Sequence, residues 1–444
     1  MNLPRAVTLL ALAWCAAFIL LALGARTYLF ADGSLFAYGV AAGEAWDYHW
    51  RQIPTRVAAY LYAPLPGQLW GALSGDPAAG VALYAALHAA APLLGLGATW
   101  AADRGGVIRL WAAASVVLFC PMLFGFPTEM WVGMAAFWPA MALAWKPGGA
   151  GRAALAAFAM AITALSHEAG LLWVLGLALL LLPFSPAGWR AGLLALPALA
   201  GWAAMKLLVT PDPYVAEVMA RVALTFTEPG NLVTTLSVTL AAALALFGAG
   251  LALRRGAWVA FGLAAMALAV WWLFLDHSLH AWARYFLRTL VFLALPALAL
   301  LAALHARGWL RRPAGLVAIA MPALLLVSLV HAVETAKFIT AWRAHLAAVQ
   351  GLVMGSEADP ALGDAVFVST ARLPARSAPL AWHSTAPFLG ALAAPGYAPA
   401  RLLVDPAAGY FWFDCRAATA NAAAERALPQ PTREMLRRYT CLHR

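Results

Sequence analysis

The side chains that could do chemistry in this chain gather in three places. The first is Asp32, which precedes Gly33 in the segment FADGSLFAY, so a carboxylate and an open backbone could face a ligand together. The second is Ser166-His167-Glu168, an ionisable pair between two apolar stretches. Ionisable groups in apolar surroundings indicate function, and Asp, Glu and His are common general acids and bases. We therefore take Asp32 and Glu168 as candidate catalytic residues and His167 as a candidate substrate-binding residue.

The third place is the segment 276–288, DHSLHAWARYFLR. Its basic residues are three, four and four positions apart, which puts them on one face of a helix. They are His277, His280, Arg284 and Arg288. Because arginine offers a fork of donors that matches phosphate, we expect a phosphate or pyrophosphate to bind here. Asp276 with the two histidines could instead hold a metal, although this spacing is no specific zinc signature. Glu129, in FPTEMW, is a further candidate for substrate binding.

The composition of the chain restricts what can position these residues. Of 444 residues, 64% are hydrophobic and 11% are charged, whereas soluble domains average about 45–50% apolar and about 25% charged. These values exclude an ordinary soluble protein and predict an all-α polytopic membrane protein. The net charge of +10 does not indicate nucleic-acid binding, because the chain lacks the charged surface of a basic soluble domain. Basic cytoplasmic loops explain it better.

Eleven apolar runs predict about eleven transmembrane helices, since roughly 20 residues cross a bilayer. The runs are 6–24, 78–100, 107–126, 130–145, 153–166, 169–184, 190–209, 232–253, 257–275, 285–304 and 314–332. The run 57–75 contains two prolines and several aromatic residues, which favours an interfacial or re-entrant segment over a crossing. We expect a transmembrane domain at 1–332, with an interfacial first outer loop at 25–77.

The charged residues support this count and give an orientation. The loops that join alternate runs hold a single acid, Asp103, and the other 18 acids lie on the opposite side or in the tail. The basic residues of those loops and adjoining helix ends are Arg5, Arg104, Arg109, Lys146, Arg152, Arg190, Arg254, Arg255, Arg307, Arg311 and Arg312. The positive-inside rule therefore predicts a bacterial-type cytoplasmic membrane protein with a cytoplasmic N-terminus and an extracytoplasmic C-terminus.

The hairpin at 153–184 is short for two crossings. At 1.5 Å per residue it supplies about 48 Å of helix, whereas two passes through the hydrocarbon core need about 60 Å. We therefore expect its tip, which carries His167 and Glu168, to lie below the outer membrane surface.

The tail at 333–444 differs from the rest of the chain. It opens with an amphipathic stretch near 334–349 and continues with short strand-like runs at 366–370, 401–404 and 410–413. This pattern predicts a small extracytoplasmic α/β domain. Cys415 and Cys441 both lie in it, on the predicted oxidising side, so a disulfide between them is as plausible as two free thiols.

The whole arrangement resembles the GT-C superfamily of membrane glycosyltransferases. The shared features are an acid directly after the first helix, interfacial segments before the second, many spans and an outer C-terminal domain. The resemblance covers the architecture of residues 1–332 and rests on no long motif. It implies membrane lipids and a polyprenyl-phosphate-linked sugar as partners, Asp32 as the catalytic acid of the family, and a loose match of Arg284 and Arg288 to its phosphate-binding residues.

The sequence departs from that family in the first outer loop. Many members place neighbouring acids there to hold a divalent metal, whereas Asp32 is followed by Gly33 and the next acids are Glu44 and Asp47. A divalent metal is therefore possible but not required. Two alternatives to sugar transfer by an acid stay open. One is a lipid-linked glycan ligase or polymerase that relies on Arg and His, and the other is a transporter or accessory subunit of a membrane complex.

Overall fold

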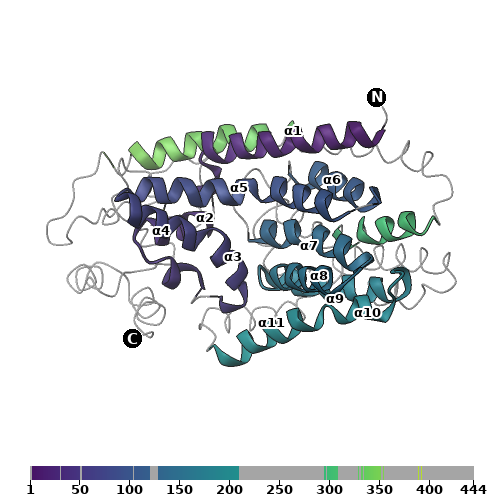
Figure 1. The fold of residues 1–444 in the computed structure, drawn as a ribbon. Coiled ribbons are helices and arrows are strands. Elements are labelled where there is room, and N and C mark those ends of the chain that lie inside the picture. The colour runs from purple at the N-terminus through teal and green to yellow at the C-terminus, as the bar shows by residue number, and fades with distance from the viewer. Residues whose placement is uncertain are drawn as a thin grey trace, which may run out of the picture.

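The computed structural model describes about half of the chain. The described residues are 3–30, 32–50, 53–103, 105–120, 129–209, 295–296, 298–308, 329, 332–333, 335–351, 354, 389 and 392. All regular secondary structure within them is helical (Figure 1). The prediction of an all-α protein is thus confirmed for this part of the chain.

Three described helices are long and apolar enough to cross a membrane, which indicates a membrane protein. They are α1 (Leu3–Gly24), α5 (Pro77–Ala102) and the nearly continuous pair α10 (Trp189–Leu193) and α11 (Leu196–Leu208). The described residues therefore support three long spans rather than the eleven that the sequence predicts. The runs at 232–253 and 257–275 and most of 285–304 and 314–332 lie outside them.

Four further runs coincide with apolar helices of 13 to 17 residues. These helices are α6 (Val107–Phe119), α7 (Met130–Trp145), α8 (Ala150–Ala164) and α9 (Glu168–Phe184). The 15 residues of α8 and 17 residues of α9 extend only about 22 and 25 Å, less than a hydrocarbon core of about 30 Å. The turn between them can therefore lie below a membrane surface, as the length of the hairpin predicts.

Helices α7, α8 and α9 pack side by side, while α1 and α5 run alongside them (Figure 1). One end of this stack is basic. Arg152 donates to the backbone oxygens of Ala102 and Ala142, and Arg307 donates to those of Phe184 and Ser185. Cations at helix C-termini complement the helix dipole, so these arginines stabilise the ends of α5, α7 and α9.

The loop that follows α1 and the segment after it fold into short helices at the other end of the molecule (Figure 1). These are η1 (Thr27–Leu29), α2 (Asp32–Ala41), η2 (Trp46–Trp50), η3 (Pro54–Arg56), α3 (Val57–Tyr62) and α4 (Pro64–Ser74). Neither α3 nor α4 is long enough to span a bilayer, which agrees with an interfacial or re-entrant segment at 57–75.

Several aromatic residues of this loop are buried. Tyr28, Phe36 and Tyr38 are buried in a second hydrophobic core together with Tyr84 of α5. Glycines make the packing close, since a Cβ at Gly67 of α4 would meet the backbone oxygen of Gly80 in α5 at 2.9 Å. The short helices from η1 to α4, residues 27–74, thus pack against α5 as one layer, which we call the loop platform.

The tail contributes a helix at 335–351, which lies beside α1 in Figure 1. Phe30 meets Phe338 edge-on at 5.1 Å between ring centroids, and Trp342 donates to the backbone oxygen of Arg26. This helix matches the amphipathic opening of the tail, but the described residues give no support to an α/β domain. The expected strands and both Cys415 and Cys441 lie outside them.

Candidate functional site

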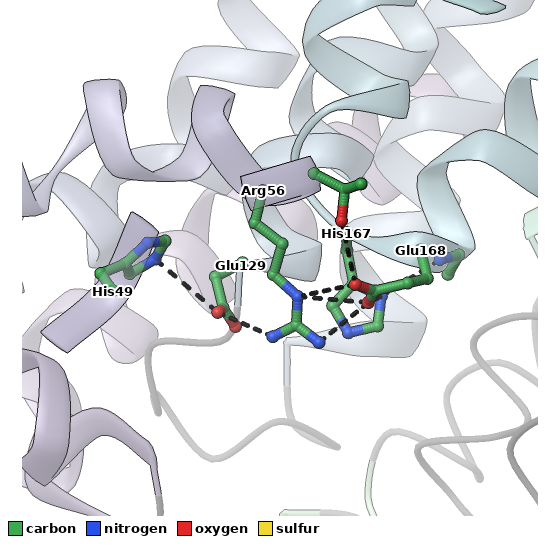
Figure 2. A network of polar contacts seen from close by, with 7 residues as sticks. His49, Arg56, Glu129, His167 and Glu168 are labelled. Carbon is green, nitrogen blue, oxygen red and sulfur yellow. Dashed lines mark hydrogen bonds and ion pairs between the residues drawn. The ribbon is translucent and has the colours of Figure 1, made fainter. Parts of the chain in front are cut away.

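Five polar side chains converge where the loop platform meets the α7–α9 stack (Figure 2). We call Arg56, Glu129, Glu168, His49 and His167 the ion-pair cluster. His49 comes from η2 and Arg56 from η3, while Glu129 immediately precedes α7. His167 and Glu168 form the turn from α8 into α9. Segments more than 100 residues apart thus supply one site.

The turn from α8 into α9 fixes the position of Glu168. His167 caps α9, because its Nδ1 accepts a hydrogen bond from the Ala169 backbone N at 3.2 Å. Gly170 allows the start of α9 to approach the end of α8 closely, since a Cβ there would collide with the backbone oxygen of Thr163. Glu168 thus occupies the first turn of α9, where the helix dipole favours a negative charge.

Arg56 bridges the two carboxylates of the cluster (Figure 2). Its Nη1 donates to Glu129 Oε1 at 2.9 Å. On the other side, its Nη2 and Nε donate to Glu168 Oε2 at 2.8 and 3.1 Å. This two-donor arrangement is the geometry in which a guanidinium binds a carboxylate most strongly and most directionally. Thr55 adds a longer hydrogen bond, from Oγ1 to Glu168 Oε1 at 3.4 Å.

The charges of the cluster are strongly coupled. Burial alone would lower the pKa of Arg56, but the adjacent Glu168 and Glu129 outweigh burial and raise it. Burial would raise the pKa of Glu129, but the adjacent Arg56 outweighs burial and lowers it. Arg56 and Glu129 are therefore a charged pair at neutral pH.

His49 is neutral at physiological pH. Burial lowers its pKa to about 4, although Glu129 opposes the change by favouring the protonated ring. Its Nε2 lies 3.7 Å from Glu129 Oε1, and its ring packs against Phe36 and Tyr60. One guanidinium and two carboxylates therefore leave a single net negative charge among Arg56, Glu129 and Glu168.

The two carboxylates differ in access. Glu129 is 1% exposed as a residue, whereas the side chain of Glu168 is 34% exposed. A molecule approaching the cluster would therefore meet Glu168, while Glu129 acts on it only through Arg56. A carboxylate paired with a guanidinium is a weak base but a good electrostatic partner for a developing positive charge.

Asp32, the predicted catalytic acid, belongs to the loop at the start of α2. It is the first residue of α2 and is partly exposed. Its charge and that of Glu129 both act on the hydroxyl of Tyr84, which places the two carboxylates within electrostatic range of one buried phenol. Tyr84 thus relates Asp32 to the ion-pair cluster through Glu129.

The structure brings together three of the predicted site residues, Glu129, His167 and Glu168. The basic face predicted for phosphate, with His277, His280, Arg284 and Arg288, lies outside the described residues. Sequence reasoning missed Arg56 and His49 as site residues. One signal could have revealed Arg56: it is the last charge before the uncharged segment 57–75, and buried acids require a nearby cation.

Within the described residues, no three His, Cys, Asp or Glu side chains converge in a way that could hold a metal ion. The two cysteines among those residues, Cys15 and Cys120, are buried free thiols in the main hydrophobic core. The polar chemistry of the described part is therefore concentrated in the ion-pair cluster and its surroundings. In comparisons with known proteins, no family model, curated protein or solved structure matches this chain.

Proposed function

We propose that this protein is an integral membrane glycosyltransferase of GT-C type, which moves a sugar from a polyprenyl-phosphate donor to an acceptor on the outer face of the cytoplasmic membrane. The supporting observation is the convergence of Glu129 and Glu168 on Arg56 at one end of the α7–α9 stack. The opposite end of the stack carries Arg152 and Arg307, as cytoplasmic helix ends do under the positive-inside rule.

The transfer needs two carboxylate roles. The acceptor oxygen forms a bond to the anomeric carbon, and the bond from that carbon to the phosphate oxygen breaks with its electron pair leaving on the polyprenyl phosphate. In this proposal Asp32 takes the proton of the acceptor hydroxyl. Glu168, held by Arg56 and partly exposed, stabilises the positive charge that develops at the anomeric carbon.

The leaving phosphate needs a cation of its own. Arg56 is occupied by two carboxylates, so a phosphate would have to displace one of them. We therefore assign the phosphate to the basic face of Arg284 and Arg288, with His277 and His280 beside them. A lipid-linked ligase or polymerase would depend on that face alone.

The proposal includes the full topology expected from the sequence. It has about eleven crossings within residues 1–332, a cytoplasmic N-terminus and an extracytoplasmic α/β domain at 333–444. Reporter fusions after Gly148 and after Gly351 test the orientation. We expect a cytoplasmic signal at the first position and an extracytoplasmic signal at the second.

The decisive experiment uses cells that lack the protein and express variants at matched levels. Mass spectrometry of lipid extracts and envelope glycans measures the unused donor and the product. We expect Asp32→Asn and Glu168→Gln to abolish transfer and to cause the sugar-charged lipid to accumulate. Asp47→Asn, an exposed acid of the same loop, is the matched control and should retain transfer.

Other outcomes would redirect the proposal. If Arg284→Ala abolishes transfer while Asp32→Asn and Glu168→Gln preserve it, the ligase or polymerase is the better assignment. If deletion of the protein changes neither lipids nor glycans, sugar transfer is wrong and a transporter or accessory role replaces it.

A further inference from the structure

Three fully buried polar side chains, one within the ion-pair cluster and two on α5, have no hydrogen-bond partners in the described structure. They are His49, Tyr84 and His88, none of them more than 2% exposed. Both ring nitrogens of each histidine and the hydroxyl of the tyrosine are unpartnered. A buried polar atom that loses its water without gaining a partner is destabilising, so five such atoms in one neighbourhood point to a bound ligand.

The three side chains are held together by aromatic packing. Tyr84 and His88 are one turn apart on α5, and their rings meet edge-on at 5.0 Å between centroids. His88 lies 6.1 Å from the ring of Tyr62, and His49 lies 5.9 Å from that of Tyr60. Both tyrosines belong to α3, which therefore extends from one histidine to the other.

The ionised Glu129 gives this neighbourhood its polarity. His49 Nε2 stands 3.7 Å from Glu129 Oε1, which is beyond the distance of a direct hydrogen bond. Glu129 also acts electrostatically on Tyr84 and His88, and Asp32 acts on Tyr84. The unpartnered atoms thus lie around one carboxylate and extend toward a second.

The occupant must be small and must both donate and accept hydrogen bonds. The side chains leave almost no exposed surface for a larger molecule to enter by. A neutral imidazole presents one donor and one acceptor, and a phenol presents both on one atom. Water meets these requirements, and because a buried water makes about three hydrogen bonds, about two waters would satisfy the five atoms.

We propose that His49, Tyr84 and His88 form a buried water-binding site that joins Glu129 to α5 and extends toward Asp32. The site hydrates the buried carboxylate on the side that Arg56 does not cover. It would also give Asp32, a candidate catalytic residue, a hydrogen-bonded connection to Glu129. This inference does not depend on sugar transfer, because its test measures structure and stability alone.

A density map of the full-length protein in lipid nanodiscs, at a resolution where ordered waters are visible, tests the site directly. We expect water peaks within hydrogen-bond distance of Tyr84 Oη and of at least one nitrogen of His49 or His88. A map that shows ordered waters elsewhere in the protein but none at these atoms overturns the proposal, whatever the variants below do.

Two matched tyrosine variants give a second measurement. Tyr62→Phe is the reference, since it removes a hydrogen bond of 2.7 Å to the Leu87 backbone oxygen and should lower the unfolding midpoint by on the order of 2 °C. A water-bound Tyr84 predicts a similar fall for Tyr84→Phe. If the midpoint of Tyr84→Phe is unchanged or higher, its hydroxyl holds no water and the proposal fails for this residue.

Discussion

Arginine side chains have different hydrogen-bond acceptors at the two ends of the α7–α9 stack. At one end, Arg152 and Arg307 donate only to backbone oxygens near helix C-termini. At the other end, Arg56 donates to the carboxylates of Glu129 and Glu168. The first pair of arginines complements helix dipoles, which any cation there would do. The second arrangement places three formal charges in a largely buried position.

The two ends therefore hold charges of two kinds: those that the helix ends explain and those that they do not. Helix ends already offer the carbonyl groups that Arg152 and Arg307 satisfy, so those arginines need no other explanation. A buried ion pair, in contrast, gains little stability over an apolar replacement. The cluster around Arg56 is therefore the place where the molecule keeps charge that its fold alone does not require.

The largest expected effect follows from removing the shared cation. Arg56→Met leaves Glu129 charged and buried without a partner, which should lower the free energy of unfolding by about 3–5 kcal/mol. Reversible unfolding of the purified protein in detergent, followed by tryptophan fluorescence, measures the loss. Arg56→Lys is the control, since it keeps the charge but loses the two-donor contact with Glu168. Its free energy of unfolding should lie between those of Arg56→Met and the wild type.

Acid should weaken the same end of the stack. His49 has a pKa of about 4 in the folded protein against 6.5 for the free side chain, so the unfolded chain binds more protons between these values. The titration of His49 alone should lower the free energy of unfolding by about 3 kcal/mol as the pH drops from 6.5 to 4. Below pH 4.5 the unfolded chain also binds a proton at Glu129 that the folded protein does not, because the pKa of Glu129 is lowered in the fold. This lowers the free energy of unfolding further. His49→Phe should flatten the first part of this profile, and a variant with an unchanged profile would argue against the assignment.

The two carboxylates should differ because their exposure differs. Glu129→Gln removes a buried partner of Arg56 and should cost about 2 kcal/mol. Glu168→Gln acts on a side chain that is 34% exposed and should cost less than about 1 kcal/mol. Thermal unfolding of the two variants side by side checks this order. Equal losses of stability for the two variants would mean that Glu129 and Glu168 are equally exposed to solvent.

The smallest effect is expected at the basic end. Arg152→Ala removes donors to the backbone oxygens of Ala102, Ala142 and Lys146, groups that water can partly solvate at a helix end. We expect a loss of about 1 kcal/mol and no change in sugar transfer, measured in the same unfolding and lipid assays. A loss as large as that of Arg56→Met would remove the contrast between the two ends.

The sequence was informative where a local rule applied. Helices α1, α5 and α7 follow their apolar runs closely, and the turn between α8 and α9 falls at His167 and Glu168 as the two apolar runs indicate. Glu129 was a candidate site residue from its sequence alone, and the structure places it beside Arg56. These features depend on hydrophobicity, length and neighbouring residues, all of which a single sequence shows directly.

Other features depend on contacts between distant segments. Arg56 lies 73 residues from Glu129 and 112 from Glu168, and no periodicity connects them. The burial of Tyr28 and Phe36 depends on how the loop packs against α5, which composition alone does not show. The short helices α6 to α9 likewise show that an apolar run need not become a helix long enough to span a bilayer alone.

The central claim is that Arg56 and Glu129 act as one charged unit, and a double-mutant cycle measures this most directly. Unfolding free energies are compared for Arg56→Met, Glu129→Gln and the double variant under the same detergent conditions. The account predicts that the double variant loses less than the sum of the single losses, by about 2 kcal/mol or more. Single losses that add to within about 0.5 kcal/mol would contradict it, because the two side chains would then contribute independently.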